Sequence, residues 1–274
     1  MKKVLVPIDF SGDSINALEH AIAIANKIDA DIRMIFVKKS KNFEAPLYFK
    51  GLDSFQGKTI NEYFDRLVDK YKSQVKNRFD YKIREGKVYK EITNQAKYDD
   101  SYLIVLGTHG ISGFEELWIG SNAFRVVSNA ECPVITVRYG FSRKEVFKIV
   151  MPIDITSESR KKVPLVAELA TLFDAEVHVV SVSETNASDI QTKLEQYATQ
   201  VIDYLKERNI KVQHEALLEN NITDMTIEYA IRVDADLIAI MTEQSENPLN
   251  IWLGPYAQQM VNHSPIPVLS VHVK

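Results

Sequence analysis

The sequence predicts a doubly wound α/β fold that is present twice in the chain. A strand-like apolar run ending in Pro-Ile-Asp occupies residues 4–9 and returns 145 residues later at residues 149–154. A second run at residues 132–137 is echoed at residues 266–271, with an offset of 134 residues. Short apolar runs alternate with amphipathic stretches in both halves, which is typical of repeated βα units on a parallel sheet.

The individual elements can be located from this alternation. The helix expected at residues 13–28 places Ile15, Leu18 and Ile22 on one face, and residues 61–75 show the same period. Five strands per half imply a doubly wound sheet, and we take the strand order 3-2-1-4-5 from fold-level preference. The strands are expected at residues 2–8, 31–37, 79–84, 102–106 and 133–137, and then at residues 147–153, 176–182, 211–215, 237–241 and 267–271.

The two repeat offsets also locate an insertion. They differ by 145 − 134 = 11 residues, so the first copy is longer, and the extra residues are expected within 39–57, where the periodicity stops. Residues 138–144 form the expected linker. The sequence therefore predicts one domain at residues 1–140 and another at residues 145–274.

Composition predicts a globular protein of the cytoplasm. The chain has 274 residues, of which 45% are hydrophobic and 26% charged. No apolar run reaches the roughly 18 residues that a membrane-spanning helix needs, and the apolar run after Met1 is too short for a secretory signal. With Cys132 as the single cysteine, no intrachain disulfide can form. We expect no membrane partner.

Charge is distributed unevenly between the halves. Lys and Arg minus Asp and Glu give 21 − 18 = +3 for residues 1–140 and 12 − 19 = −7 for residues 141–274. This asymmetry favours an anionic ligand in the first half. The basic residues are scattered and form no stripe, so nucleic acid binding is not expected.

A glycine segment comes directly after the fourth strand of the first half. In doubly wound sheets, ligands bind beyond the carboxyl ends of the strands, so Asp9 after the first strand should share a crevice with the segment that starts at Gly107. Glycine lets backbone N–H groups approach an oxyanion, and a helix N-terminus favours phosphate. A glycine-rich turn with Ser121 as an ordinary helix N-cap remains the alternative. The segment contains Gly107, Gly110, Gly120, Ser121 and Asn122.

With these residues in place, the sequence resembles the universal stress protein family, in particular its tandem-domain members. The family signature, Gly-x-x-Gly, nine residues, Gly-Ser/Thr, is met by Gly107, Gly110, Gly120 and Ser121, and the match extends over nearly the whole chain. The resemblance implies two flavodoxin-like domains of the adenine nucleotide alpha hydrolase type. It also implies a site for ATP or ADP, with Mg²⁺ as a candidate bridge between phosphates.

The resemblance assigns roles residue by residue. Asp9 would face the ribose hydroxyls, and Val37 would hold the adenine through its backbone. Pro7 and Leu106 belong to the same expected site at the strand ends. The phosphates would be held by Gly107, Gly110, Gly120, Ser121 and Asn122. Ile111 departs from the family, since many members carry a basic residue there.

The second half departs from the signature. Met241, Gln244 and Pro255 stand where the first half has Gly107, Gly110 and Ser121, and Pro255 removes a donor N–H at the helix start. We therefore expect no nucleotide there. Asp154 persists, and we interpret it as a cap of the next helix. The second half would be a structural, pairing or other-ligand domain.

The expected function is regulatory binding in a stress response. His109 is the only histidine near the proposed site, and no nucleophile with a base has a recognisable spacing, so we expect at most a weak ATPase. The histidines are dispersed, which gives no metal site. The edge strands near Val134 and Val268 would pair the halves like the homodimer of the family, and further dimerisation is compatible with this. The alternatives are a nucleotide-free scaffold for an unidentified protein partner and a slow ATP hydrolase.

Overall fold

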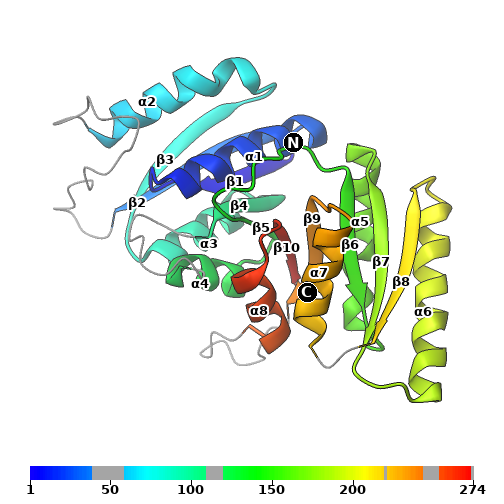
Figure 1. Ribbon diagram of the computed structural model, residues 1–274. Coiled ribbons are helices and arrows are strands. Elements are labelled where there is room, and N and C mark those ends of the chain that lie inside the picture. The colour runs from blue at the N-terminus through cyan, green and yellow to red at the C-terminus, as the bar shows by residue number, and fades with distance from the viewer. Residues whose placement is uncertain (39–58, 109–119, 219–220, 243–252, 273–274) are drawn as a thin grey trace. The chain divides into compact units, whose positions relative to one another are not determined.

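The computed structural model describes residues 1–38, 59–108, 120–218, 221–242 and 253–272 (Figure 1). The chain divides into two compact units, Met1–Lys144 and Glu145–Lys274. We call them the first unit and the second unit. The insertion expected within residues 39–57 lies outside the described residues. Among the described residues, no helix is both long enough and apolar enough to cross a membrane.

The sheet of the first unit is fully parallel and has the order β3-β2-β1-β4-β5, which confirms the expected 3-2-1-4-5 topology. The two central strands, β1 and β4, are almost completely buried, because a doubly wound sheet is covered on both faces. The expected strands lie within one or two residues of the observed ones. These are β1 (Lys3–Pro7), β2 (Asp31–Lys38), β3 (Phe79–Glu85), β4 (Leu103–Gly107) and β5 (Val134–Val137).

Two helices of the first unit begin at residues suited to capping. The side chain of Ser11 accepts a hydrogen bond from the Ser14 amide at the start of α1, and Thr59 and Glu62 form a capping box at the start of α2. In Figure 1, α1 and α2 lie on one face of the sheet and α3 and α4 on the other. The helices are α1 (Gly12–Ile28), α2 (Ile60–Tyr71), α3 (Val88–Tyr98) and α4 (Ser121–Asn129), with a 3-10 turn, η1 (Lys72–Gln74), after α2.

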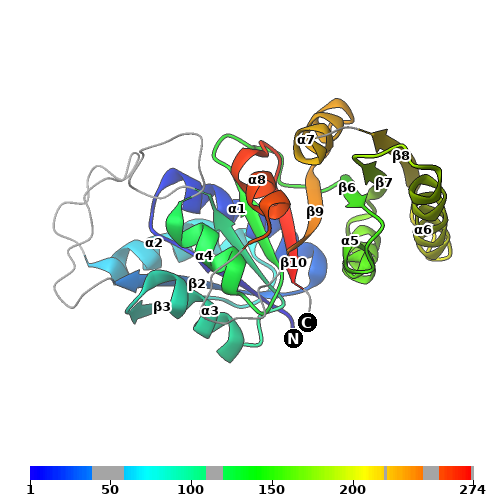
Figure 2. The same cartoon turned by 90° about the horizontal axis from the view of Figure 1, so that it is seen from below.

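The second unit repeats the same topology. Its sheet has the order β8-β7-β6-β9-β10, again with all strands parallel. In the view of Figure 2, α7 and α8 lie together on one face of this sheet and α5 and α6 on the other. The elements are β6 (Lys148–Ile153), η2 (Glu158–Arg160), α5 (Val163–Phe173), β7 (Glu176–Ser183), α6 (Ser188–Lys206), β8 (Val212–Leu218), α7 (Ile222–Arg232), β9 (Leu237–Thr242), α8 (Pro255–His263) and β10 (Val268–His272).

An ion-pair cluster joins four elements at the amino end of the first sheet. The Arg33 guanidinium on β2 donates to both carboxylate oxygens of Asp80 on β3, each at 2.7 Å, and to Asp99 after α3 at 2.7 Å. Lys3 on β1 also donates to Asp99, at 3.2 Å. The bidentate geometry and the second carboxylate compensate for burying the guanidinium.

Candidate functional site

The carboxyl end of β1 carries a tightly ordered acidic loop. Oδ1 of Asp9 accepts hydrogen bonds from the backbone N of Ser11 (3.0 Å) and from its hydroxyl (2.6 Å). The Asp9 amide in turn donates to the Ser14 hydroxyl at 3.4 Å. Oδ2 of Asp9 makes no hydrogen bond to a described residue, so one carboxylate oxygen fixes the loop and the other is available to a ligand.

Phe10 holds this loop in a strained conformation. Its φ of 65° lies in the left-handed region, which is costly for a residue with a bulky side chain. The ring is buried against Phe36, Tyr63 and Phe64, with centroid distances of 5.5, 5.4 and 5.0 Å. The aromatic contacts stabilise the turn, and the turn sets the direction of the Asp9 carboxylate.

Gly107 ends β4 beside the first turn of α1. A Cβ added to Gly107 would lie 2.8 Å from the backbone carbon of Asp13, which is closer than a side-chain carbon can approach. The glycine is therefore required by the packing of α1 on the strand end. Thr108 comes next, is buried, and donates its amide to the Val137 carbonyl at 3.1 Å.

The N-terminus of α4 faces the same edge of the sheet. The Gly120 amide donates to the Thr108 carbonyl at 2.7 Å, so this N–H is already used within the protein. Gly120 is also the N-cap, which makes Ser121 the first helical residue instead of an ordinary cap. The amides of Ser121 and Asn122 make no hydrogen bond to a described residue and remain open to an anion.

The structure brings most of the expected site residues to one edge. The β1–β4 register pairs Leu5 with Ile104, and continuing it places Asp9 beside Thr108, one residue beyond Gly107. β2 extends past the end of β1. Ile35 is the last β2 residue that pairs with β1, whereas Val37 and Lys38 still pair with β3. Pro7 and Leu106 lie at the ends of β1 and β4. Gly110, His109 and Ile111 lie outside the described residues.

The second unit repeats the acidic loop nearly atom for atom. Oδ1 of Asp154 accepts from the Thr156 amide (2.7 Å) and hydroxyl (2.5 Å), and the Asp154 amide donates to Ser159 at 3.2 Å. The interpretation of Asp154 as a cap of the next helix is wrong, because α5 begins only at Val163 and its N-cap, Lys162, has no side-chain cap bond. Asp154 stabilises the loop, as Asp9 does.

The start of the next helix differs between the units. Met241 stands where the first unit has Gly107, and Glu158 stands where it has Asp13. Pro164 lies in the first turn of α5 and has no N–H to donate to a preceding helical turn, so a helix that began as early as α1 does could not continue through it. Residues 158–160 accordingly form the 3-10 turn η2, and α5 starts later than α1 in the aligned sequence.

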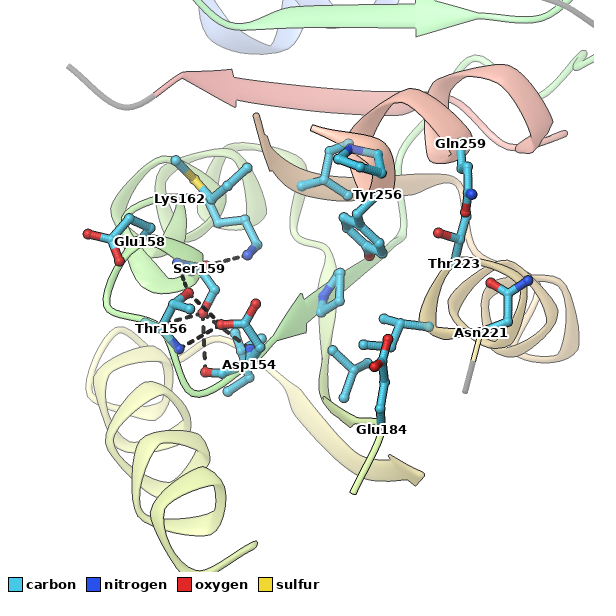
Figure 3. Close-up of a pocket in the computed structure, with 17 residues that line it drawn as sticks. Asp154, Thr156, Glu158, Ser159, Lys162, Glu184, Asn221, Thr223, Tyr256 and Gln259 are labelled. Atoms are coloured by element: carbon cyan, nitrogen blue, oxygen red, sulfur yellow. Dashed lines mark hydrogen bonds between the residues drawn. The ribbon is translucent and has the colours of Figure 1, made fainter. Parts of the chain in front are cut away.

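A cavity of about 610 Å³ lies at the carboxyl end of the second sheet (Figure 3). Its walls include Ile153, Val182 and Ile240, and its polar lining includes Asp154, Lys162, Glu184 and Tyr256. Sequence reasoning missed Lys162 and Tyr256. Alignment at the repeat offsets could have found them, because they replace Ala17 and Asn122 of the first unit.

Lys162 is a buried cation in the wall of this cavity. Its side chain is 1% exposed, and Nζ donates to the backbone carbonyl of Ser159. Burial lowers the pKa of Lys162 to about 7, although the nearby Asp154 carboxylate acts in the opposite direction. The group is therefore only partly protonated at neutral pH.

The geometry defines the class of protein: a tandem doubly wound α/β protein with an acidic loop at the carboxyl edge of each sheet. The model of the universal stress protein family matches residues 1–138 and again residues 145–272. The chain belongs to this family.

Comparisons with individual proteins agree with the family assignment. A universal stress protein of Methanocaldococcus jannaschii is 33% identical over 140 residues, which cover 50% of this chain and 82% of that relative. The solved structure of a putative universal stress protein from Pseudomonas aeruginosa is 14% identical in sequence. Its superposition covers 99% of this chain and 93% of that chain, with a TM-score of 0.71. One from Archaeoglobus fulgidus, 16% identical, covers 98% of both chains with a TM-score of 0.71. The structural likeness is one of fold.

Proposed function

We propose that the first unit binds ATP or ADP and that the second unit does not. Asp9 contacts the ribose hydroxyls through Oδ2, and the backbone of Val37 contacts the adenine. The phosphates lie against the open amides of Ser121 and Asn122. Mg²⁺ is held by the phosphates themselves. The nucleotide acts as a regulatory ligand of a stress-response protein in the cytoplasm.

The observation that carries this proposal is the set of groups left unused at one edge of the sheet. One Asp9 oxygen and two helix-end amides have no partner among the described residues. An acceptor suited to hydroxyls and donors suited to an anion therefore stand at the same sheet edge. The Gly120 amide has no part in the phosphate binding that we propose, because it already donates to the Thr108 carbonyl.

The second unit supplies the substitution that tests the proposal. Pro255 occupies the first helical position of α8, where Ser121 stands in α4, and both helices begin after a glycine N-cap of nearly the same conformation. Ser121→Pro therefore removes one amide donor at a position where the fold accepts proline. We expect ATP affinity to fall about tenfold or more, because a hydrogen bond to a charged group contributes roughly 1.5–3 kcal/mol.

Ser121→Ala is the matched control, since it removes the hydroxyl and keeps the amide. Isothermal titration of the full chain with ATP and ADP should show a much smaller loss for this variant than for Ser121→Pro. Equal affinities for the wild type and Ser121→Pro would contradict the proposed phosphate site. Absence of saturable heat with the wild type would favour the nucleotide-free scaffold, and phosphate release dependent on Ser121 would favour the slow hydrolase.

A further inference from the structure

The cavity of the second unit differs in charge from the corresponding edge of the first. At the repeat offsets, Ser183, Glu184 and Gln259 stand where the first unit has Lys38, Lys39 and Arg125. Three cationic positions have become neutral or acidic. The basic residue gained, Lys162, is buried in the wall, and its pKa of about 7 leaves it largely uncharged at about pH 8. A polyphosphate would therefore meet carboxylates where the sequence of the first unit offers positive charge.

The polar lining of the cavity includes donors such as Lys162 and Gln259, but the carboxylates and the phenol in it offer acceptor oxygens that are not used among the described residues. Oδ2 of Asp154 makes no hydrogen bond to a described residue, because Oδ1 takes both bonds of the loop. Glu184, just after β7, is exposed and likewise has no hydrogen bond or ion pair with a described residue. Figure 3 shows Asp154, Glu184 and Tyr256 around the same hollow.

Tyr256 adds a third unused oxygen. Its hydroxyl is buried and makes no hydrogen bond of normal geometry with a described residue. The Thr226 hydroxyl beside it donates instead to the Ile222 carbonyl, at 2.7 Å. Burial raises the pKa of Tyr256 well above its ordinary value, so the group stays a neutral phenol whose oxygen can accept a hydrogen bond and whose ring attracts cations.

The walls complete the chemical description of the ligand. Ile153, Val182 and Ile240 are between 0% and 5% exposed and give the cavity an apolar interior. Its volume of about 610 Å³ lies in the range of sites for small organic molecules. An ammonium group offers donors to acceptor oxygens of this kind, and an attached apolar body fills the remaining space.

We propose that this cavity binds a primary organic amine, with the ammonium group held by Asp154 and Tyr256, Glu184 at the entrance, and the apolar body against the β6, β7 and β9 strand ends. The site is separate from the proposed nucleotide site of the first unit. The ligand proposed for the second unit is a cation, whereas the nucleotide proposed for the first unit is an anion.

The proposal is tested by amide NMR titration of the full chain with phenethylamine. Phenethyl alcohol has the same shape without the charge, so it separates ammonium recognition from filling of the apolar space. At about pH 8 the amine stays protonated. We expect saturable shifts around residues 154–159, 184 and 255–259, and an affinity at least tenfold higher for the amine than for the alcohol.

Two substitutions in the second unit and one in the first locate the binding. Asp154→Asn keeps the Oδ1 acceptor of the loop and removes the charge, and Glu184→Gln changes an exposed side chain. Urea unfolding of Asp154→Asn checks that the second unit stays folded, because the removed charge lies near the buried Lys162. We expect Asp154→Asn to weaken amine binding about tenfold and Glu184→Gln to weaken it less. Asp9→Asn is the matched control in the first unit and should leave amine binding unchanged.

The proposal is overturned if phenethylamine gives no saturable shifts, or if the alcohol binds as well as the amine. Equal effects of Asp9→Asn and Asp154→Asn would also overturn it, as would displacement of the amine by ATP, which would make the cavity a nucleotide site. Loss of ATP binding in Ser121→Pro with amine binding retained is the expected pattern for two independent sites.

Discussion

Gly107 and Met241 occupy the same place in the two sheets, and the first helix begins differently in the two units. In the first unit, the glycine lets the backbone at Asp13 approach, so α1 begins directly after the acidic loop. In the second unit, a 3-10 turn replaces that first helical turn. Glycine at this position serves packing, whereas the sequence pattern had indicated only phosphate binding.

Gly107→Ala should therefore destabilise the first unit. The added methyl group meets backbone atoms that cannot rotate away, and overpacking of this kind costs about 1–3 kcal/mol. Gly120→Ala is the control, since its φ is −57° and the nearest atom to a new Cβ is the Thr108 carbonyl oxygen at 3.2 Å. Urea unfolding should show a larger loss for Gly107→Ala, and equal losses would refute the packing explanation.

Lys162 makes stability depend on pH in a predictable direction. Its pKa falls from 10.5 in its ordinary state to about 7 in the fold, so the unfolded chain binds more protons between these values. Stability therefore rises as pH increases from about 7 to 10.5, by roughly 5 kcal/mol from this group. Below pH 7 the penalty of burying the charge is fully present.

Lys162→Met should remove that rise. Because the substitution replaces a buried charge with an apolar chain of similar length, the variant should be more stable than the wild type at about pH 6, and the gap should close towards about pH 10. The measurement is urea unfolding of both proteins across this range. A difference in unfolding free energy that stays constant across this pH range would show that the fold does not lower the pKa of Lys162.

At the scale of elements, the Arg33 cluster joins β2, β3 and the end of α3. Burial alone would raise the pKa values of Asp80 and Asp99, but the hydrogen bonds and charges of their partners outweigh it and hold both below the ordinary value. Their contribution to stability is therefore present above about pH 4 and is lost as pH falls through the depressed values.

Arg33→Met should leave two carboxylates without their shared partner. The expected cost is about 3 kcal/mol at neutral pH, as for other broken buried ion pairs. The same variant should lose less stability than the wild type on acidification below about pH 4. Thermal unfolding at several pH values measures both effects, and parallel pH profiles for the two proteins would contradict the role of the cluster.

Element positions could be predicted from the sequence because each strand is a buried apolar run and each helix has one apolar face. α2 is shorter than expected, since its last turn is the 3-10 turn η1. The late start of α5 has a local signal in the sequence, because Pro164 cannot lie inside a helix that begins as early as α1 does. Lys162 and Tyr256 could not be found from the glycine signature, because neither residue belongs to that pattern.

At the scale of the whole molecule, two copies of one fold keep the same acidic loop and differ in what surrounds it. Asp9 and Asp154 are held by equivalent hydrogen bonds, so the loop itself does not determine the ligand. The helix after the fourth strand opens with Ser121 and Asn122 in one unit and with Pro255 and Tyr256 in the other. The ligand preference that we propose for each unit rests on that difference.

The most direct test of this account is the ATP titration of the full chain, with Asp9→Asn and Asp154→Asn measured beside the wild type. Each variant keeps its loop and removes one carboxylate charge. The account predicts one nucleotide per chain, weakened by Asp9→Asn and untouched by Asp154→Asn. Two nucleotides per chain, or a loss confined to Asp154→Asn, would contradict it.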